Sequence, residues 1–260
     1  MTTMTLADGP GPTEPLPVLT GLSDLDDLTG PLPRGKLTVL AGRPSAGTSA
    51  LALTIALNAN ATGRTAAFVN LQAGAEALKI AMLSATAGIN ADRPESLNPG
   101  RIDRMHRAGE FLKGRPLLSW TPEGTPVLRG IRNTLANHTV DVLLVDDVGL
   151  LSPHSRYDAT AVKELAGLAA ADNVALVLTA HLRPTRDGYH LPPTTDDLYD
   201  PELAAAADAL VLLHRPNFEG GAPKRGSEVD LIAVKGWPRT GTATVRFEPE
   251  YHRMVDLPNA

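Results

Sequence analysis

Residues 42–49 constrain this chain more than any other segment. They read Gly-Arg-Pro-Ser-Ala-Gly-Thr-Ser and follow the spacing G-x-x-x-x-G-K-[ST] of the loop that cradles nucleotide phosphates, except at the lysine. The apolar run 36–41 before them predicts a buried strand, and the apolar run 49–57 after them predicts a buried helix. Strand, glycine loop and helix are the context that this motif requires. The segment therefore predicts a phosphate-binding loop (P-loop).

The loop retains one of its two means of holding phosphate. Backbone N–H groups and the following helix N-terminus hold phosphate oxygens, whereas the lysine adds a full charge at the β- and γ-phosphates. At the lysine position stands Thr48. We expect phosphate binding through the backbone without the lysine's charge. The candidate cofactor-binding residues in the loop are Gly42, Arg43, Pro44, Ser45, Ala46, Gly47, Thr48 and Ser49.

Composition restricts the class of protein. The chain has 260 residues, 43% of them hydrophobic, a formal net charge of −5 and no cysteine. It is long enough for one large α/β domain or two small ones, and it cannot form disulfides or thiolate metal sites. Its acidity argues against a broadly basic surface for nucleic acid, while a few Lys or Arg could still line a channel. We see no membrane span or secretory signal and expect a cytoplasmic protein.

The pattern along the chain predicts a flexible leader at residues 1–17 and a single domain at residues 18–260. Further predicted strands cover 65–71, 142–147, 174–180, 209–213, 229–235 and 242–247, and predicted helices cover 74–87, 101–113, 127–138 and 159–171. Alternating strands and helices predict an α/β fold with a mainly parallel, twisted sheet flanked by helices. The last strands, with no long helices between them, predict an antiparallel edge.

Two residues are predicted to bind magnesium. Asp146 follows four apolar residues, as the Walker-B aspartate does, and such an acid at a strand end holds Mg²⁺ directly or through water. Ser49 would supply the hydroxyl on the magnesium side of the loop. The alternative for Asp146 is an acid that caps a turn. Asp147 is the weaker candidate, because alternation along a strand directs it to the other face.

Gln72 and His181 are, with Asp146, the candidate catalytic residues, because each closes a predicted strand. Gln72 can orient an attacking water by hydrogen bonds but cannot accept its proton at neutral pH. His181 is placed either to sense a γ-phosphate or to be an ordinary loop histidine bonded to backbone. Arg43 either lends charge to the phosphates or points to solvent.

Together these motifs resemble the C-terminal RecA-like motor domain of DnaB-type replicative helicases, from about residue 19 to residue 257. Residues 42–47 resemble the family's A-R-P-S-M-G loop, residues 72–78 its E-M-G-A-E-Q-L stretch and residues 88–93 its G-I-D-A-x-R stretch. Residues 20–26 resemble the segment that opens the family's domain. The Arg-Pro-Ser triplet favours DnaB over RecA, RadA or KaiC relatives.

The resemblance implies a RecA-like P-loop NTPase that uses ATP and Mg²⁺, with partners in DNA replication. It implies a homo-oligomer in the form of a hexameric ring, contact with single-stranded DNA and contact with other replication proteins. Asp146 matches the Walker-B aspartate, Ser49 matches the magnesium-binding hydroxyl, and His181 falls where the family has a glutamine sensor.

Basic residues near the late strand ends have two interpretations. Arg215, Lys235 and Arg239 are either solvated surface or fingers that reach a neighbouring subunit's nucleotide. The resemblance supports the second interpretation for Lys235, which matches the lysine of the family's K-x-R element. The arginine of that element falls on Trp237, and Arg239 lies nearby but out of register.

The chain departs from the family where charge matters. Thr48 replaces the loop lysine and Gln72 replaces the catalytic glutamate. Residues 152–159 form a shorter, less basic version of the family's DNA-contacting loop, and residues 198–202 lack its R-E-S-G residues. These departures predict a degenerate member with weak nucleotide binding and little ATP hydrolysis. The alternatives are an active ATP-dependent DNA helicase or ATPase, a non-catalytic binding or regulatory paralogue, and a KaiC- or RadA-like accessory ATPase.

Overall fold

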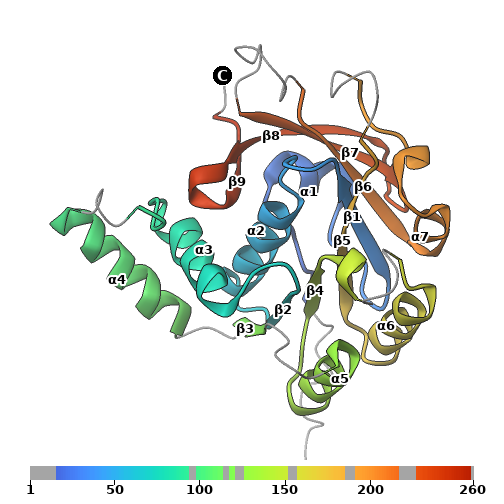
Figure 1. The fold of residues 1–260 in the computed structure, drawn as a ribbon, viewed down its shortest axis with the longest axis horizontal. Coiled ribbons are helices and arrows are strands. Elements are labelled where there is room, and N and C mark those ends of the chain that lie inside the picture. Colours follow the sequence, from blue (N-terminus) through green and yellow to red (C-terminus); the bar gives the residue numbers. More distant parts are fainter. Residues whose placement is uncertain are drawn as a thin grey trace, which may run out of the picture.

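A computed structural model describes residues 16–93, 98–113, 117–120, 126–151, 157–184, 191–216 and 227–258. Within these residues the strands form one sheet in the order β3-β2-β4-β5-β1-β6-β7-β8-β9, with helices on both faces (Figure 1). The parallel strands are β1 (Leu37–Gly42), β2 (Ala66–Asn70), β3 (Leu117–Trp120), β4 (Val142–Asp146), β5 (Ala175–His181) and β6 (Ala209–His214). The antiparallel strands are β7 (Glu228–Lys235), β8 (Gly241–Glu248) and β9 (Arg253–Asp256). The predicted parallel sheet with an antiparallel edge is thus confirmed.

Seven α-helices lie in the described residues. They are α1 (Ser23–Thr29), α2 (Thr48–Ala61), α3 (Ala75–Ala87), α4 (Pro99–Lys113), α5 (Val127–Asn137), α6 (Ala159–Ala171) and α7 (Pro201–Ala206). Short 3-10 turns are η2 (Val148–Leu150), η3 (Thr195–Asp197) and η4 (Pro249–Tyr251). None of the described helices combines the length and the apolar character needed to cross a bilayer.

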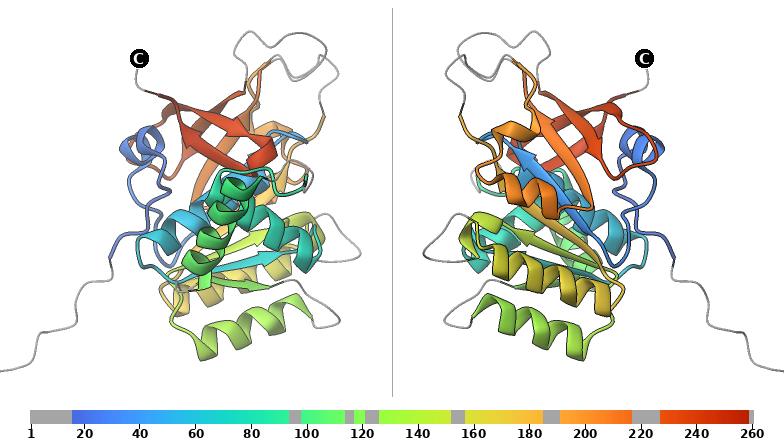
Figure 2. Two further views of the ribbon diagram at one scale, coloured as in Figure 1. Left: turned by 90° about the vertical axis from the view of Figure 1, so that its left-hand side faces the viewer. Right: turned by 90° about the vertical axis from the view of Figure 1, so that its right-hand side faces the viewer.

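Two hydrophobic cores enclose the parallel strands. Alternate residues of each strand point to opposite faces, so Leu144 packs with α2 and α3 while Leu143 packs with α5 and α6. Figures 1 and 2 show α5 and α6 on the face of the sheet opposite to α2 and α3. Burial on both faces explains why these strands are continuous apolar runs in the sequence.

The structure corrects several predicted boundaries. The helix after the loop continues past residue 57 to Ala61, and its Asn58 donates a hydrogen bond to the carbonyl of Thr20 at 3.0 Å. The prediction also lacked α1, β3, α7 and β9. These elements are too short for a periodic pattern to stand out, and packing against the large elements stabilises them.

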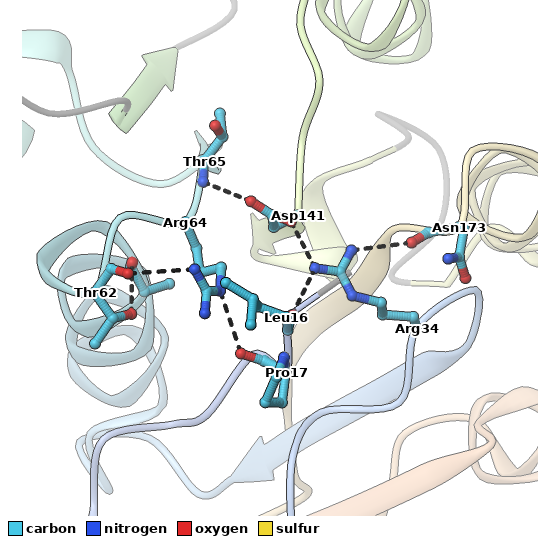
Figure 3. A network of polar contacts seen from close by, with 9 residues as sticks. Leu16, Pro17, Arg34, Thr62, Arg64, Thr65, Asp141 and Asn173 are labelled. Carbon is cyan, nitrogen blue, oxygen red and sulfur yellow. Dashed lines mark hydrogen bonds and ion pairs between the residues drawn. The ribbon is translucent and has the colours of Figure 1, made fainter. Parts of the chain in front are cut away.

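The start of the described chain is held at the sheet edge where β2 and β4 begin (Figure 3). Arg34 donates to the carbonyl of Leu16 at 3.0 Å and to the carboxylate of Asp141 at 2.5 Å. Arg64 donates to the carbonyl of Pro17 at 3.3 Å. Of the predicted leader 1–17, these two residues are described, and residues 1–15 lie outside the described part.

Asp141 is the centre of this network, because it also accepts a hydrogen bond from the backbone N–H of Thr65 at 2.8 Å. Asp141→Ala removes the acceptor of two partly buried donors, so the free energy of unfolding should fall by about 1–3 kcal/mol. Denaturant titration measures it. The matched control is Asp172→Ala at an exposed acid, which should change stability by less than about 0.5 kcal/mol. Equal effects of the two variants would contradict the role of the network.

Candidate nucleotide-binding site

The predicted site residues meet at the carboxyl edge of the parallel strands. Gly42, the last residue of β1, lies opposite His181 of β5 and Leu213 of β6. Asp146 at the end of β4 lies opposite Asn70 at the end of β2. Ligands of open α/β sheets bind at this edge, so the loop, the acid and the histidine face a common region.

The loop between β1 and α2 has the tight backbone that its glycines predict. Ser45 and Gly47 have φ angles of 65° and 98°, in the left-handed region that favours glycine. A Cβ on Gly47 would lie 2.7 Å from a methyl of Met254. The N–H of Ala46 donates to the carbonyl of Arg43 at 3.0 Å and closes a turn. The strand–loop–helix context is therefore confirmed, and the backbone fits a phosphate cradle.

Thr48 starts α2 and is buried. Its methyl would lie 2.9 Å from a Cβ built on Gly42, so the side chain packs back over the first glycine of the loop. It brings an apolar group, and no charge, to the position from which a lysine would reach along the phosphates.

The two side chains predicted to bind magnesium lie in contact with each other. Ser49 donates a hydrogen bond to Oδ1 of Asp146 at 3.0 Å, and Thr179 of β5 donates to the same oxygen at 2.5 Å. Hydroxyl and carboxylate oxygens are the ligands that Mg²⁺ prefers, usually with substrate phosphates and water completing the shell. The described residues contain no cluster of three metal-binding His, Cys, Asp or Glu side chains.

Asp147, and not Asp146, is the acid that caps a turn. Its Oδ1 accepts a hydrogen bond from the N–H of Gly149 at 2.9 Å and caps η2, while its Oδ2 lies 3.3 Å from Nε2 of His181. The predicted division of the two acids, one toward α2 and one away from it, is what the contacts show.

Burial raises the pKa of Asp146, and the hydrogen bonds from Thr179 and Ser49 oppose that rise. The neighbouring Asp147 carboxylate adds to the rise. A carboxylate in such surroundings is costly when ionised and is stabilised by a nearby cation. A positive charge beside Asp146 would therefore stabilise its ionised form.

His181 and Gln72 lie at this edge in different settings. The ring of His181 contacts the Asp147 carboxylate, and its Nδ1 is buried with no hydrogen-bond partner among the described residues. The interpretation of His181 as a loop histidine bonded to backbone is therefore wrong.

Gln72 is exposed beyond the end of β2, because the strand stops at Asn70, not at residue 71 or 72. Asn70 fixes the turn by accepting from the N–H groups of Gln72 and Ala73 at 3.0 and 3.1 Å.

Arg43 does not point to solvent, which corrects one of its two interpretations. Its side chain is buried and donates to the carbonyl of Leu191 at 2.8 Å and to Asp197 at 3.3 Å. The guanidinium thus ties the loop to the segment before α7, and its charge faces a carboxylate.

The side chains of Lys235 and Arg239 contact other elements of their own chain. Lys235 donates to the carbonyls of Ala204 and Ala205 at 3.0 and 3.3 Å, at the end of α7 where a cation is favoured. Arg239 donates to the carbonyl of Asp27 in α1. Their role toward a neighbouring subunit stays a prediction.

The family model described as the DnaB-like helicase C-terminal domain matches residues 17–256. The chain belongs to this family. Replicative DNA helicase DnaC of Bacillus subtilis is 26% identical over 259 residues, covering 92% of this chain and 56% of the relative. A probable replicative DNA helicase of Trieres chinensis is 26% identical over 270 residues, covering 92% of this chain and 58% of the relative. The chain thus spans little more than half the length of these relatives.

Solved structures show the same fold. One solved ATPase domain gives a TM-score of 0.80 at 20% identity, covering 93% of this chain and 91% of that one. A DnaB-like replicative helicase, described with its interactions with primase, gives 0.80 at 20% identity, covering 93% and 63%. The RadB recombinase gives 0.58 at 16% identity, covering 93% and 100%. The predicted RecA-like fold is confirmed.

Sequence reasoning missed two site residues of this DnaB-like domain. Thr179 is the one polar residue inside the apolar stretch 175–180, and a buried hydroxyl in such a strand signals a partner. Arg215 was interpreted only as solvated surface or as a finger toward a neighbouring subunit. It donates to the carbonyl of Ser45 in the P-loop of the same chain at 3.2 Å, and no local sequence pattern predicts this contact.

Asp146→Asn should stabilise this DnaB-like domain at neutral pH in a chelating buffer. The native pKa is raised, so the ionised carboxylate destabilises the fold. That penalty is absent below the unfolded-state pKa of about 4 and develops as the pH rises toward the native pKa. Thermal melts from pH 4 to 8 should show a gain that grows with pH, while the exposed control Asp196→Asn shows none. A loss of stability that is constant with pH would refute this account.

Proposed function

We propose that the chain is a DnaB-like P-loop domain of DNA replication that binds Mg²⁺-nucleotide weakly and hydrolyses ATP slowly. One observation carries the proposal: Ser49 and Thr179 contact Asp146 beside a loop whose lysine position holds a buried threonine. Family membership supports the use of ATP and Mg²⁺.

Different residues would bind the phosphates and the magnesium ion. Backbone N–H groups of the loop 42–49 and the N-terminus of α2 would hold the phosphate oxygens. The Ser49 hydroxyl and the Asp146 carboxylate would hold Mg²⁺, which neutralises phosphate charge when bound. Gln72 and His181 would face the terminal phosphate and the attacking water from the ends of β2 and β5.

The free energy of a lost phosphate contact and the rate contribution of a lost general base both favour weak binding and slow hydrolysis. A charge-assisted contact to phosphate contributes about 1.5–3 kcal/mol, and more in a transition state where charge develops. A general base contributes about 10²–10⁴-fold in rate, and Gln72 cannot act as one. The two losses need not add, because groups of one site act as a unit.

Contact with single-stranded DNA is proposed to be weak. A cavity of about 280 Å³ on the far side of Asp147 is lined by Asp200, Tyr157 and residues of η2 and α7. Burial raises the pKa of Tyr157, and the carboxylates of Asp200 and Glu202, which place negative charge beside the cavity, add to that rise. This region follows β4, where the resemblance places DNA contact, and negative potential opposes DNA phosphates.

The partners follow from the resemblance and remain proposals. A hexameric ring would let Lys235 and Arg239 approach a neighbour's nucleotide. A solved DnaB-like helicase is described with its interactions with primase, so a replication protein is the proposed class of partner. A cytoplasmic location accompanies this proposal.

Steady-state ATP hydrolysis tests the proposal. Turnover by the purified chain should stay well below about 1 s⁻¹, the lower end of ordinary enzymes, because both the lysine and the base are missing. Single-stranded DNA should not stimulate it. Turnover of about 1 s⁻¹ or faster that Asp146→Ala abolishes would instead establish the alternative of an active ATPase or helicase.

Thr48→Lys should strengthen binding of Mg²⁺-ADP by about tenfold or more, because it returns a charge-assisted phosphate contact. Isothermal titration calorimetry measures the affinity. Thr48→Met is the matched control, since it adds a long side chain without charge and should give no gain. No gain with lysine would mean that the loop does not hold phosphate, and would favour a protein-binding paralogue.

A further inference from the structure

The cavity of about 280 Å³ beside Asp147 is a second place where this domain can hold a ligand. It lies between η2, the end of β5 and the segment that leads into α7. Among the described residues that line it, none belongs to the loop 42–49, so the cavity is separate from the phosphate cradle. Its volume is close to the lower end of ordinary ligand pockets, about 300 Å³, and therefore suits a small group.

The charge at this cavity is negative. Asp147 and Asp200 line it, and Asp147 is only 6% exposed. No lysine or arginine is among the described residues that line it. Burial raises the pKa of Tyr157, and the Asp200 carboxylate adds to that rise, so this charge is felt at the cavity wall. Charges partly removed from water attract a cation more strongly than fully hydrated ones do.

The walls combine aromatic rings with hydrogen-bond acceptors. Tyr157 and Tyr199 line the cavity, and the faces of such rings attract cations. His181 also lines it, with Nε2 at 3.3 Å from Oδ2 of Asp147. A proton on Nε2 faces that carboxylate and leaves Nδ1 as an acceptor. Nδ1 is buried without a hydrogen-bond partner among the described residues, so a ligand that donates hydrogen bonds would satisfy it.

We propose that this cavity binds an alkylguanidinium group, carried either by a small guanidine or by an arginine side chain of another protein. A guanidinium presents five N–H donors in one plane, pairs with carboxylates and stacks on aromatic rings. An ammonium group would pair with the carboxylates as a point charge and lacks the flat face. The carboxylates of Asp147 and Asp200 oppose an anion. This inference does not depend on nucleotide binding by the P-loop.

The test is an NMR chemical-shift titration of the full chain with butylguanidine, and butylurea is the matched neutral ligand. Butylguanidine should bind about tenfold or more tightly than butylurea, because its contacts to the carboxylates are charge-assisted. A third ligand, Nα-acetylarginine N-methylamide, separates the two sources of the group. Tighter binding of this ligand than of butylguanidine would support an arginine side chain, and the reverse order would support a small guanidine.

Asp200→Asn tests the charge without removing the cap of α7. Asp200 accepts a hydrogen bond from the N–H of Glu202 at 2.8 Å, and asparagine caps a helix about as well as aspartate. The variant should therefore fold and should bind butylguanidine about tenfold more weakly or worse. Asp196→Asn is the matched control, because Asp196 is exposed in η3 and does not line the cavity. It should change the affinity by less than about twofold.

Three results would overturn the inference: no binding of butylguanidine, equal binding of butylguanidine and butylurea, or equal effects of Asp200→Asn and Asp196→Asn. Calorimetric titration of Mg²⁺-ADP with the same variants keeps the two proposals apart. Nucleotide affinity should be the same in Asp200→Asn and in the wild type, because the cavity is separate from the loop. A chain that binds butylguanidine but not Mg²⁺-ADP would support this inference and overturn the proposed function.

Discussion

The parallel pairing of β1 between β5 and β6 is the constraint on which the rest of the site depends. Parallel strands end at one edge of the sheet, so the register that sets Gly42 opposite His181 and Leu213 fixes where every later side chain arrives. The pairing of β4 with β5 sets Val145 opposite Leu178 and so brings Thr179 to Asp146, and the pairing of β1 with β6 brings Arg215 to the loop. The antiparallel strands β7–β9 add a support behind the loop, because Phe247 and Met254 pack against Gly47.

The balance of charge decides what such a site can bind. Asp146 and Asp147 are adjacent and buried, so this part of the site carries carboxylates that a nearby cation would stabilise. In the family the P-loop lysine adds positive charge on the phosphate side, and here Thr48 adds none. His181 faces Asp147, and Arg43 faces Asp197. Arg215, which follows the neighbouring strand β6, donates to the carbonyl of Ser45 in the loop.

Local patterns predicted much of this arrangement. The apolar runs of β1, β4 and β5 are long enough to identify buried strands, and the motif around Gly42, Gly47 and Ser49 carries its own backbone geometry. The same patterns failed at strand ends and short elements. β2 stops at Asn70 because its amide caps the following turn, and α7 begins at Pro201 after a capping aspartate. Such ends depend on single hydrogen bonds, which hydrophobic periodicity does not record.

The sequence by itself determined the fold class and the P-loop with its missing lysine, and it singled out Ser49 and Asp146 as candidate magnesium ligands, because these follow from composition and spacing along one segment at a time. The tertiary structure alone decided that Thr179 shares the Asp146 oxygen, that Arg43 is turned to Asp197 and that Arg215 lies against Ser45. Each of these contacts joins residues far apart in the chain. Their geometry exists only once strand order and register are fixed, and no local pattern of side chains specifies it.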